Sequence, residues 1–384
     1  MEPTGYRVHV ANVGIKDETL DFLVVASDRV ATVAATFTRS LFAGPSVVVS
    51  REAAASGRAR AIVVVSKNAN VATGEEGLAD ARELQSRTAA LVGASADDVL
   101  VASTGVIGRR YPIDRIRSHF DAIEWPPTGP ATFDDAATAI MTTDTRAKVS
   151  RTVIGDGPAQ LVGIAKGVGM IEPDMATLLT FLFTDAEVEP DVLDAVFRRV
   201  VDRTFNSLSI DTDTSTSDTA VVMANGAAGR VDDDELEAAL ECVALELVRM
   251  IASDGEGATK RMEVSVTGGR DDAQAKRIAK AVVNSPLVKT AVHGADPNWG
   301  RIAMAVGKCH DETDVRAERV AISIGGVEMY PAIADDAALD KAAAHMRQDV
   351  VEIEVDLGIG DGRATVYGCD LSDGYIRINA DYTT

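Results

Sequence analysis

Hydrophobic and polar positions follow two periods along this chain, one typical of strands and one typical of helices. Short runs rich in β-branched residues and bounded by turn formers predict strands. Such runs lie at 6–14, 21–27, 31–38, 61–68, 97–105, 148–154, 160–167, 177–184, 262–268, 319–330, 350–358, 363–370 and 375–382. The runs at 148–154 and 160–167 are expected to pair, because only a short turn separates them.

Apolar residues spaced three and four apart predict the helices between these strands. They lie at 73–93, 189–204, 232–253, 271–283 and 335–348, and the segment 136–145 is expected to begin as a helix and run into a polar turn. Thr73 and Glu76 have the spacing of a capping box, and Pro190 suits the first turn of its helix. The Pro-rich segment WPPTGP at 125–130 is the clearest loop. Without a solenoid repeat or a low-complexity linker, the pattern predicts an α/β or α+β class with mixed sheets and one compact unit.

Composition narrows the classes of function. The chain has 384 residues, of which 46% are hydrophobic. Its 38 basic and 59 acidic residues give a formal net charge of −21. This acidity opposes binding to nucleic acid or to anionic membranes, and no apolar run reaches the about 18 residues of a membrane span. The N-terminus lacks the pattern of a secretory signal. Cys242, Cys309 and Cys369 are odd in number and widely spaced, which suits a reducing cytoplasm.

A hydroxyl residue opens the apolar run at 177–184, directly after the glycine-rich and acidic segment KGVGMIEPDMA. Such a run is usually a core strand, and its first threonine usually satisfies nearby backbone groups. Gly167, Gly169 and Pro173 permit an unusual backbone path, however, and Thr177 could attack the carbonyl before it. Cleavage between Ala176 and Thr177 would free an α-amine with a reference pKa of about 8. That amine could act as the general base for the adjacent hydroxyl.

Such a nucleophile needs donors for the oxyanion that develops on the substrate. Thr104 and Gly105 follow the strand at 97–105 and offer a hydroxyl and an unhindered amide. Judged by themselves, residues of this kind more often form an ordinary strand-to-loop turn.

Other polar motifs give weaker signals. Asp211, Asp213 and Asp218 invite a metal interpretation, but the spacing fails the calcium-loop pattern, which favours a polar loop. Glu256 lies in a glycine-rich loop, SDGEGATK, and would suit a cationic substrate amine. The cluster around Trp299, HGADPNWGR, is either a rigid turn or a pocket wall. We find no P-loop, dinucleotide fingerprint, GxSxG elbow or HExxH helix.

Taken in order, these motifs resemble those of the ornithine acetyltransferase (glutamate N-acetyltransferase, ArgJ) family from Tyr6 to Thr384. The matching segments are ASTGVIG, MTTDT, AKGVGMIEPDMATLLTF, DTDTSTSDT, SDGEGATK, DPNWGR and the terminal RIN. Within the family, the sequence looks especially like the homologue of the clavulanic acid gene cluster. The resemblance implies a DmpA/ArgJ-like αββα fold of the self-processing N-terminal-nucleophile class.

The same resemblance implies the following chemistry. The chain would cut itself into residues 1–176 and 177–384, which reassemble as a heterotetramer with two of each piece. N2-acetyl-L-ornithine would acylate Thr177, and L-glutamate would accept the acetyl group in a ping-pong cycle without a cofactor or metal. The implied oxyanion hole is Thr104 and Gly105. The implied substrate contacts are Thr142, Lys166, Thr177, Glu256, Asn379 and Thr384, and Thr143 competes with Thr142 for its role.

Three alternatives stay open on the sequence. A related self-processing aminopeptidase or amidase would use water in place of glutamate. A bifunctional enzyme would also accept acetyl groups from acetyl-CoA. A catalytically silent homologue would bind the metabolites without processing.

Overall fold

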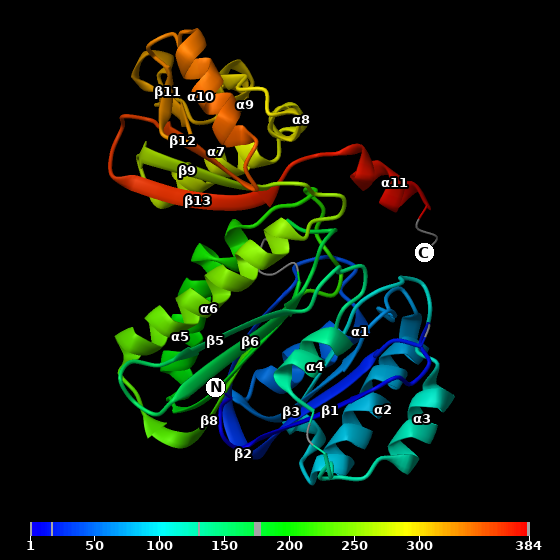
Figure 1. The fold of residues 1–384 in the computed structure, drawn as a ribbon. Coiled ribbons are helices and arrows are strands. Elements are labelled where there is room, and N and C mark those ends of the chain that lie inside the picture. Colours follow the sequence, from blue (N-terminus) through cyan, green and yellow to red (C-terminus); the bar gives the residue numbers. More distant parts are fainter. Residues whose placement is uncertain (1, 17, 130, 173–177, 382–384) are drawn as a thin grey trace.

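The protein consists of two lobes that meet at a narrow junction (Figure 1). The structure is a computed structural model, and it describes all residues except 1, 17, 130, 173–177 and 382–384. An eight-stranded sheet forms the larger lobe and a five-stranded sheet the smaller one. The predicted cleavage point after Ala176 lies within the sequence of the larger lobe, so both predicted pieces would contribute strands to it.

The larger lobe contains most of the elements that position the site. In chain order they are β1 (Tyr6–Ala11), β2 (Phe22–Phe37), α1 (Pro45–Ala54), β3 (Arg58–Val65), α2 (Gly74–Val92), β4 (Val99–Ser103), α3 (Ile113–Ala122), α4 (Phe133–Ala139), β5 (Lys148–Val153), β6 (Gln160–Lys166), β7 (Leu179–Glu187), α5 (Pro190–Arg203), β8 (Thr219–Arg230) and α6 (Asp233–Ser253). Single 3₁₀ turns at Ala96–Asp98 and Phe205–Ser207 precede β4 and follow α5.

Strand β2 divides the eight-stranded sheet into two halves. Its first part pairs with β1 and β3, its second part pairs with β8, and the pairing with β3 is interrupted between Ala26 and Ala31. The strand order is β4-β3-β2-β8-β7-β6-β5, with β1 also on β2. A long strand that bends in this way can belong to two sheet layers at once.

Three hydrophobic cores separate four layers. One core joins α1, α2 and α3 to the β1–β4 half, a second joins the two half-sheets around Phe133 of α4, and a third joins the β5–β8 half to α5 and α6. Phe22, Phe181 and Phe197 are fully buried, one in each of these cores. The αββα arrangement expected from the resemblance is therefore confirmed.

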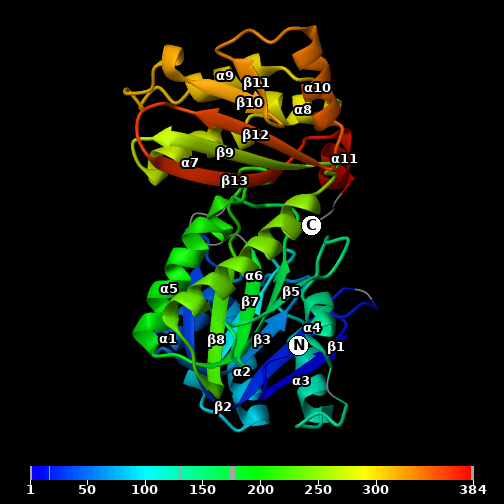
Figure 2. The ribbon, with the colours of Figure 1, turned by 60° about the vertical axis from the view of Figure 1, so that its left-hand side comes forward.

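The smaller lobe has its own core and a mixed sheet in the order β11-β10-β12-β9-β13 (Figure 2). Its elements are β9 (Arg261–Gly269), α7 (Asp272–Val283), α8 (Pro286–Gly294), α9 (Trp299–Gly307), a 3₁₀ turn (Ala317–Arg319), β10 (Ala321–Ile324), β11 (Val327–Tyr330), α10 (Asp336–Met346), β12 (Val350–Asp356) and β13 (Gly362–Cys369). Trp299 opens α9 and stacks on Tyr330, with 5.4 Å between the ring centroids, so this cluster combines a helix start with a pocket wall.

Some local predictions were wrong. Residues 375–382 were expected to form a strand, but α11 (Asp373–Asp381) is a helix that extends from β13 back toward the larger lobe (Figure 1). Over so short a segment, its alternating apolar residues fit the period of a strand and the period of a helix equally well. The runs at 21–27 and 31–38 form the single strand β2. Helices α1, α3, α8 and α9 were not predicted.

The predicted capping box of α2 is also absent. The Thr73 hydroxyl donates to the backbone and side-chain oxygens of Asn70, at 3.0 and 2.9 Å, and accepts no helix N–H. Glu76 instead pairs with Arg110. Among the described residues, no helix is both long enough and apolar enough to span a membrane.

Candidate active site

Four loops of the larger lobe bring the predicted site residues together. Thr104 follows β4 and Lys166 ends β6, while the segment after α4 carries Thr143 and the segment after α6 carries Glu256. These positions are far apart in sequence, and the sheet edges and the helix ends place them in contact. Of the predicted residues, Ala176, Thr177 and Thr384 lie outside the described residues.

Lys166 connects directly to the predicted oxyanion hole. Its Nζ donates to Thr104 Oγ1 at 3.1 Å. A hydroxyl that accepts from an ammonium keeps its own proton for another acceptor, which suits a group that stabilises an oxyanion. Both residues line a small cavity of about 20 Å³, together with Leu178 and Leu179, which directly follow Thr177 in the sequence.

Gly105 lies where only glycine fits. Its φ is +128°, and a Cβ at this position would stand 2.2 Å from the carbonyl carbon of Lys67. Lys67 itself has a positive φ of 69°. This close approach of two backbone segments fixes the direction of the loop that follows Thr104.

Burial and neighbouring charges compete at Lys166. Burial lowers the pKa of Lys166, whereas the carboxylates of Asp144, Asp218 and Glu256 raise it; the net pKa lies below that of an exposed lysine. Lys148 adds to the lowering. Because Lys166 contacts Thr104, its amino group is placed to bind a substrate carboxylate beside the predicted oxyanion hole.

A buried ion cluster that sequence reasoning missed connects three of the loops. Lys148 Nζ lies 2.7 Å from Asp144 and 2.6 Å from Asp254, and the side chain of Lys148 is fully buried. Asp144 also accepts the amides of Thr142 and Gly167, at 3.0 and 2.8 Å. In the sequence, Lys148 begins a predicted strand between Arg146 and Arg151, and nothing there marks its side chain as buried.

This environment affects the protonation of Asp144. Burial alone raises the pKa of Asp144, but Lys166, Lys148 and the Gly167 amide outweigh burial and lower it overall. Asp144 is therefore a carboxylate that ties the Thr142 loop to the glycine-rich loop after β6.

Glu256 has two side-chain partners. Thr143 Oγ1 donates to Glu256 Oε1 at 3.0 Å, and Asn379 Nδ2 of α11 donates to Glu256 Oε2 at 2.9 Å. Helix α11 thus brings the predicted contact Asn379 to the larger lobe. Of the two adjacent threonines, Thr143 contacts Glu256, whereas Thr142 binds Asp144 through its amide.

The aspartate-rich loop folds against the glycine-rich loop. Asp211 accepts the amides of Met170 and Ile171 at 2.6 and 2.8 Å, which is the polar-loop arrangement that the sequence favoured. Over the described part of the chain, no group of three His, Cys, Asp or Glu side chains is placed to hold a metal ion.

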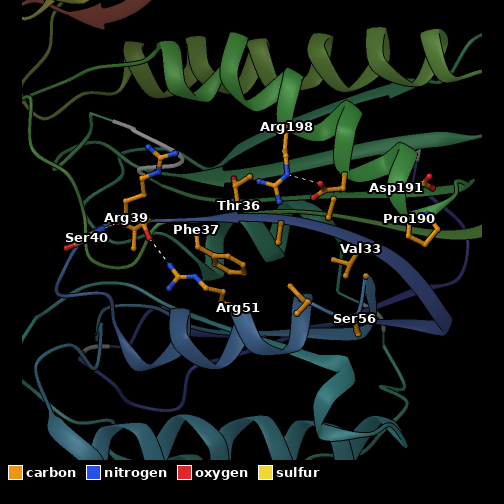
Figure 3. A pocket seen from close by; sticks show the side chains of 17 residues that line it. Val33, Thr36, Phe37, Arg39, Ser40, Arg51, Ser56, Pro190, Asp191 and Arg198 are labelled. Atoms are coloured by element: carbon orange, nitrogen blue, oxygen red, sulfur yellow. Dashed lines mark hydrogen bonds and ion pairs between the residues drawn. The ribbon is translucent and has the colours of Figure 1, made fainter.

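A large cavity of about 860 Å³ shares no lining residue with these loops. It lies between the end of β2, α1 and α5, and Figure 3 shows Arg39, Arg51 and Arg198 around it. Arg198 pairs with Asp194 at 2.7 Å, and Arg51 donates to the carbonyl oxygen of Thr38 at 2.9 Å. These arginines support the surrounding structure, and no predicted nucleophile or oxyanion donor lies among the lining residues.

Comparison with known proteins decides the family. The model described as ArgJ family matches residues 7–384. The chain belongs to the ArgJ family. It is 61% identical over 388 aligned positions to glutamate N-acetyltransferase Oat2 of Streptomyces clavuligerus, covering 100% of this chain and 98% of that protein. It is 52% identical over 382 positions to arginine biosynthesis bifunctional protein ArgJ 2 of Nostoc sp., with the same coverages.

A solved ArgJ structure supports the fold. The arginine biosynthesis bifunctional protein argJ of Bacillus halodurans matches with a TM-score of 0.50 and 39% identity, over 53% of this ArgJ chain and 98% of the solved chain. The family and the resemblance to the Streptomyces clavuligerus relative, both expected from the ordered motifs, are confirmed.

Proposed function

We propose that this ArgJ protein transfers the acetyl group of N2-acetyl-L-ornithine to L-glutamate. The observation that carries the proposal is the contact of Lys166 with Thr104 in a cavity bounded by Leu178. Membership of a family that includes a glutamate N-acetyltransferase supports this assignment. This reaction requires an oxyanion hole and a cation that binds the substrate carboxylate. It also requires an anionic group that binds the ornithine amine, and the carboxylate of Glu256 is placed for this role.

The proposed enzyme first processes itself. The Thr177 hydroxyl attacks the carbonyl carbon of Ala176, the C–N bond breaks, and an ester forms between the two residues. Water hydrolyses this ester and leaves a carboxylate on Ala176 and a free α-amine on Thr177. The products are pieces of 176 and 384 − 176 = 208 residues.

Transfer then uses the new terminus. The α-amine of Thr177 takes the proton of the hydroxyl, the hydroxyl oxygen attacks the acetyl carbonyl, and Thr104 and Gly105 stabilise the oxyanion. Ornithine leaves with a proton, and the acetyl group stays as an ester on Thr177. The amine of glutamate attacks that ester and departs as N-acetylglutamate, so the covalent ester carries the group without a cofactor.

The coverage of the solved structure supports processing. The Bacillus halodurans chain is matched along 98% of its length by only 53% of this chain. Residues 177–384 also make up slightly more than half of the sequence. We propose that the two pieces stay together in the cytoplasm as a heterotetramer with two of each, as the family resemblance implies.

Intact mass spectrometry with N-terminal sequencing tests the proposal. We expect two pieces in the purified protein, the second beginning at Thr177, and one added acetyl group on that piece after mixing with N2-acetyl-L-ornithine. Thr177→Ala should give an uncut, folded and inactive chain. A single unbroken chain with full activity would overturn the mechanism.

The hydrolase alternative has a direct test. N2-acetyl-L-ornithine is supplied with and without glutamate, and release of ornithine is measured. The transferase releases ornithine in repeated turnovers only when glutamate is present, whereas an amidase releases it at equal rates in both mixtures.

A bifunctional enzyme is the second candidate, because several relatives carry the name bifunctional. Acetyl-CoA and glutamate, supplied without N2-acetyl-L-ornithine, would form N-acetylglutamate if acetyl-CoA also acylates Thr177. The acetylated piece in the mass spectrum reports this first step separately.

A further inference from the structure

We propose that Asp370 is a positioning residue that sets the geometry of the cation site formed by Glu256 and Asn379. The inference rests on the proposed function, since this site would bind the side-chain amine of the donor, N2-acetyl-L-ornithine. The chain enters the smaller lobe through 254–260, which contains Glu256, and leaves it through 370–372, which leads into α11 and Asn379 (Figure 1). We name these two segments the lobe junction.

The carboxylate of Asp370 fastens the two segments of the lobe junction to each other. Its Oδ1 accepts the amides of Thr259 and Lys260 at 2.8 and 3.0 Å, and its Oδ2 accepts the Thr259 hydroxyl at 2.5 Å. The amide of Asp370 donates in return to the carbonyl oxygen of Lys260 at 3.1 Å. Asp370 is only 3% exposed, and hydrogen bonds to a charged group are strong in such surroundings.

Helix α8 contacts the same carboxylate from within the smaller lobe. His293 Nδ1 lies 2.7 Å from Asp370 Oδ2, and the side chain of Asp370 is fully buried. Lys260 Nζ donates to the carbonyl oxygens of Val292 and His293 at 2.7 and 3.0 Å, near the end of the helix. Asp370 and its neighbour Lys260 therefore connect the lobe junction to a helix of the smaller lobe.

A further contact places the start of α11 against the residue next to Glu256. Ser372 Oγ donates to the carbonyl oxygen of Gly257 and accepts the amide of Gly374 at 3.0 Å. Gly257 has a φ of 69°, and a Cβ there would stand 2.2 Å from the Tyr375 nitrogen. The two backbones approach closely at this point, so the positions of Glu256 and α11 depend on each other.

These contacts explain how two residues that are distant in sequence meet at one site. Glu256 and Asn379 are 123 positions apart, and Asn379 Nδ2 lies 2.9 Å from Glu256 Oε2. A shift of one junction segment along the other changes this distance, because one of the two residues belongs to each side. Hydrogen bonds weaken steeply when their distance and angle change. Asp370 thus acts on the cation site through the backbone between Glu256 and Thr259.

The experiment measures formation of the acetylated piece in the processed protein at several donor concentrations. Two donors are compared, N2-acetyl-L-ornithine and N2-acetyl-L-norvaline, in which hydrogen replaces the side-chain amine. Asp370→Asn removes the charge with little change of shape, and Thr259→Val removes one hydroxyl donor to Asp370. Asp185→Asn is the matched control, because Asp185 is 2% exposed and accepts the amides of Thr4 and Gln160 near the far end of β7.

We expect the half-saturating concentration of N2-acetyl-L-ornithine to rise about tenfold in Asp370→Asn, with a maximal rate within a factor of about two of wild type. For N2-acetyl-L-norvaline both values should stay within about twofold, because this donor has no amine for the cation site. Thr259→Val should shift the value for ornithine in the same direction by a smaller factor, and Thr259→Ser should restore it. Asp185→Asn should keep the wild-type preference between the donors.

A double variant tests whether Asp370 acts through the cation site. Glu256→Gln removes the charge that would bind the ornithine amine and should raise the half-saturating concentration by itself. Adding Asp370→Asn to this variant should raise it further by no more than about twofold, since effects that pass through one shared contact are not additive.

Three results would overturn the inference. An unchanged preference between the donors in both Asp370→Asn and Thr259→Val would show that the cation site does not depend on this carboxylate. An equal loss with both donors would show that the lobe junction only maintains the fold. A loss of about tenfold in the Glu256→Gln background would show that Asp370 acts independently of the cation site. If wild type forms no acetylated piece, the proposed function itself fails, which is distinguishable from each of these results.

Discussion

Lys148 Nζ lies 2.7 Å from a carboxylate oxygen of Asp144, and neither side chain is exposed to solvent. Asp254 completes the cluster at 2.6 Å from the same nitrogen. Asp144 precedes β5, and Asp254 follows α6 by one residue, so the ion cluster joins the two segments that carry Thr143 and Glu256. Lys148 is the ion-pair partner of both carboxylates.

Replacing the lysine removes the ion-pair partner of two buried carboxylates. We expect Lys148→Met to lower the free energy of unfolding by about 3–5 kcal/mol, the usual cost of an uncompensated buried charge. Denaturant unfolding at neutral pH measures the change. Arg230→Met is the matched control, because the ion pair of Arg230 with Glu189 is exposed on both sides, and it should change stability little. Equal losses in the two variants would contradict the role of burial.

A comparison of Gly105 with Gly108 separates the effect of backbone strain from the effect of a steric collision. Both have positive φ, at 128° and 82°, but a Cβ at Gly108 meets nothing within 4 Å, whereas one at Gly105 collides with the Lys67 backbone. We expect Gly105→Ala to lower kcat by about 10²–10³-fold through the displaced oxyanion amide. Gly108→Ala should retain activity and lose about 1 kcal/mol of stability. Steady-state kinetics measure the activity of each variant, and thermal unfolding measures its stability. A fully active Gly105→Ala enzyme would contradict the assignment of Gly105 to the oxyanion hole.

Much of the fold follows from local sequence patterns. The helix at 189–204 has Pro190 at its start and apolar residues on one face, and it forms α5 almost as predicted. The strands β5 and β6 pair across a short turn as expected. The hydrophobic patterns of these segments are unambiguous, and the tertiary contacts favour the same secondary structure as the local sequence does.

The wrong predictions have physical causes. Helix α11 is short and makes a tertiary contact through Asn379, so its period alone could not distinguish helix from strand. The bend of β2 depends on which neighbours pair with each half, and this information is not local. The partnership of Lys148 with Asp254 depends on residues more than a hundred positions apart, and no sequence spacing reveals it.

Glu256 offers a test of the cation site. We expect Glu256→Gln to raise the KM for N2-acetyl-L-ornithine by about ten- to a hundredfold, because a charged contact to the ornithine amine is replaced by a neutral one. The KM for glutamate should change less, since its side chain has no attraction to the acid. Separate kinetics for donor and acceptor measure this difference. Glu52→Gln, which removes only an exposed pair with Arg82, should leave both values unchanged.

A histidine pair far from the site predicts a sensitivity to acid. His9 Nε2 and His119 Nε2 lie 3.1 Å apart, a distance that suits one donor and one acceptor in neutral rings. Burial, followed by repulsion from His119, lowers the pKa of His9 to about 4, and burial also lowers the pKa of His119. The unfolded chain, with an ordinary histidine pKa of about 6.5, binds protons more readily in this range, so stability falls as the pH drops from 6.5 toward 4.

We expect the His9 contribution to the free energy of unfolding to fall by about 1 kcal/mol between pH 7 and pH 5, since partial solvent exposure of the ring weakens the effect. Denaturant unfolding at the two pH values measures the loss, and a His9→Gln/His119→Gln variant should lose less than wild type because its pair no longer titrates. His310→Gln, at an exposed histidine, should behave as wild type does. If the double variant loses as much stability as wild type over this interval, other groups carry the acid sensitivity and the two rings are not held neutral by their contact.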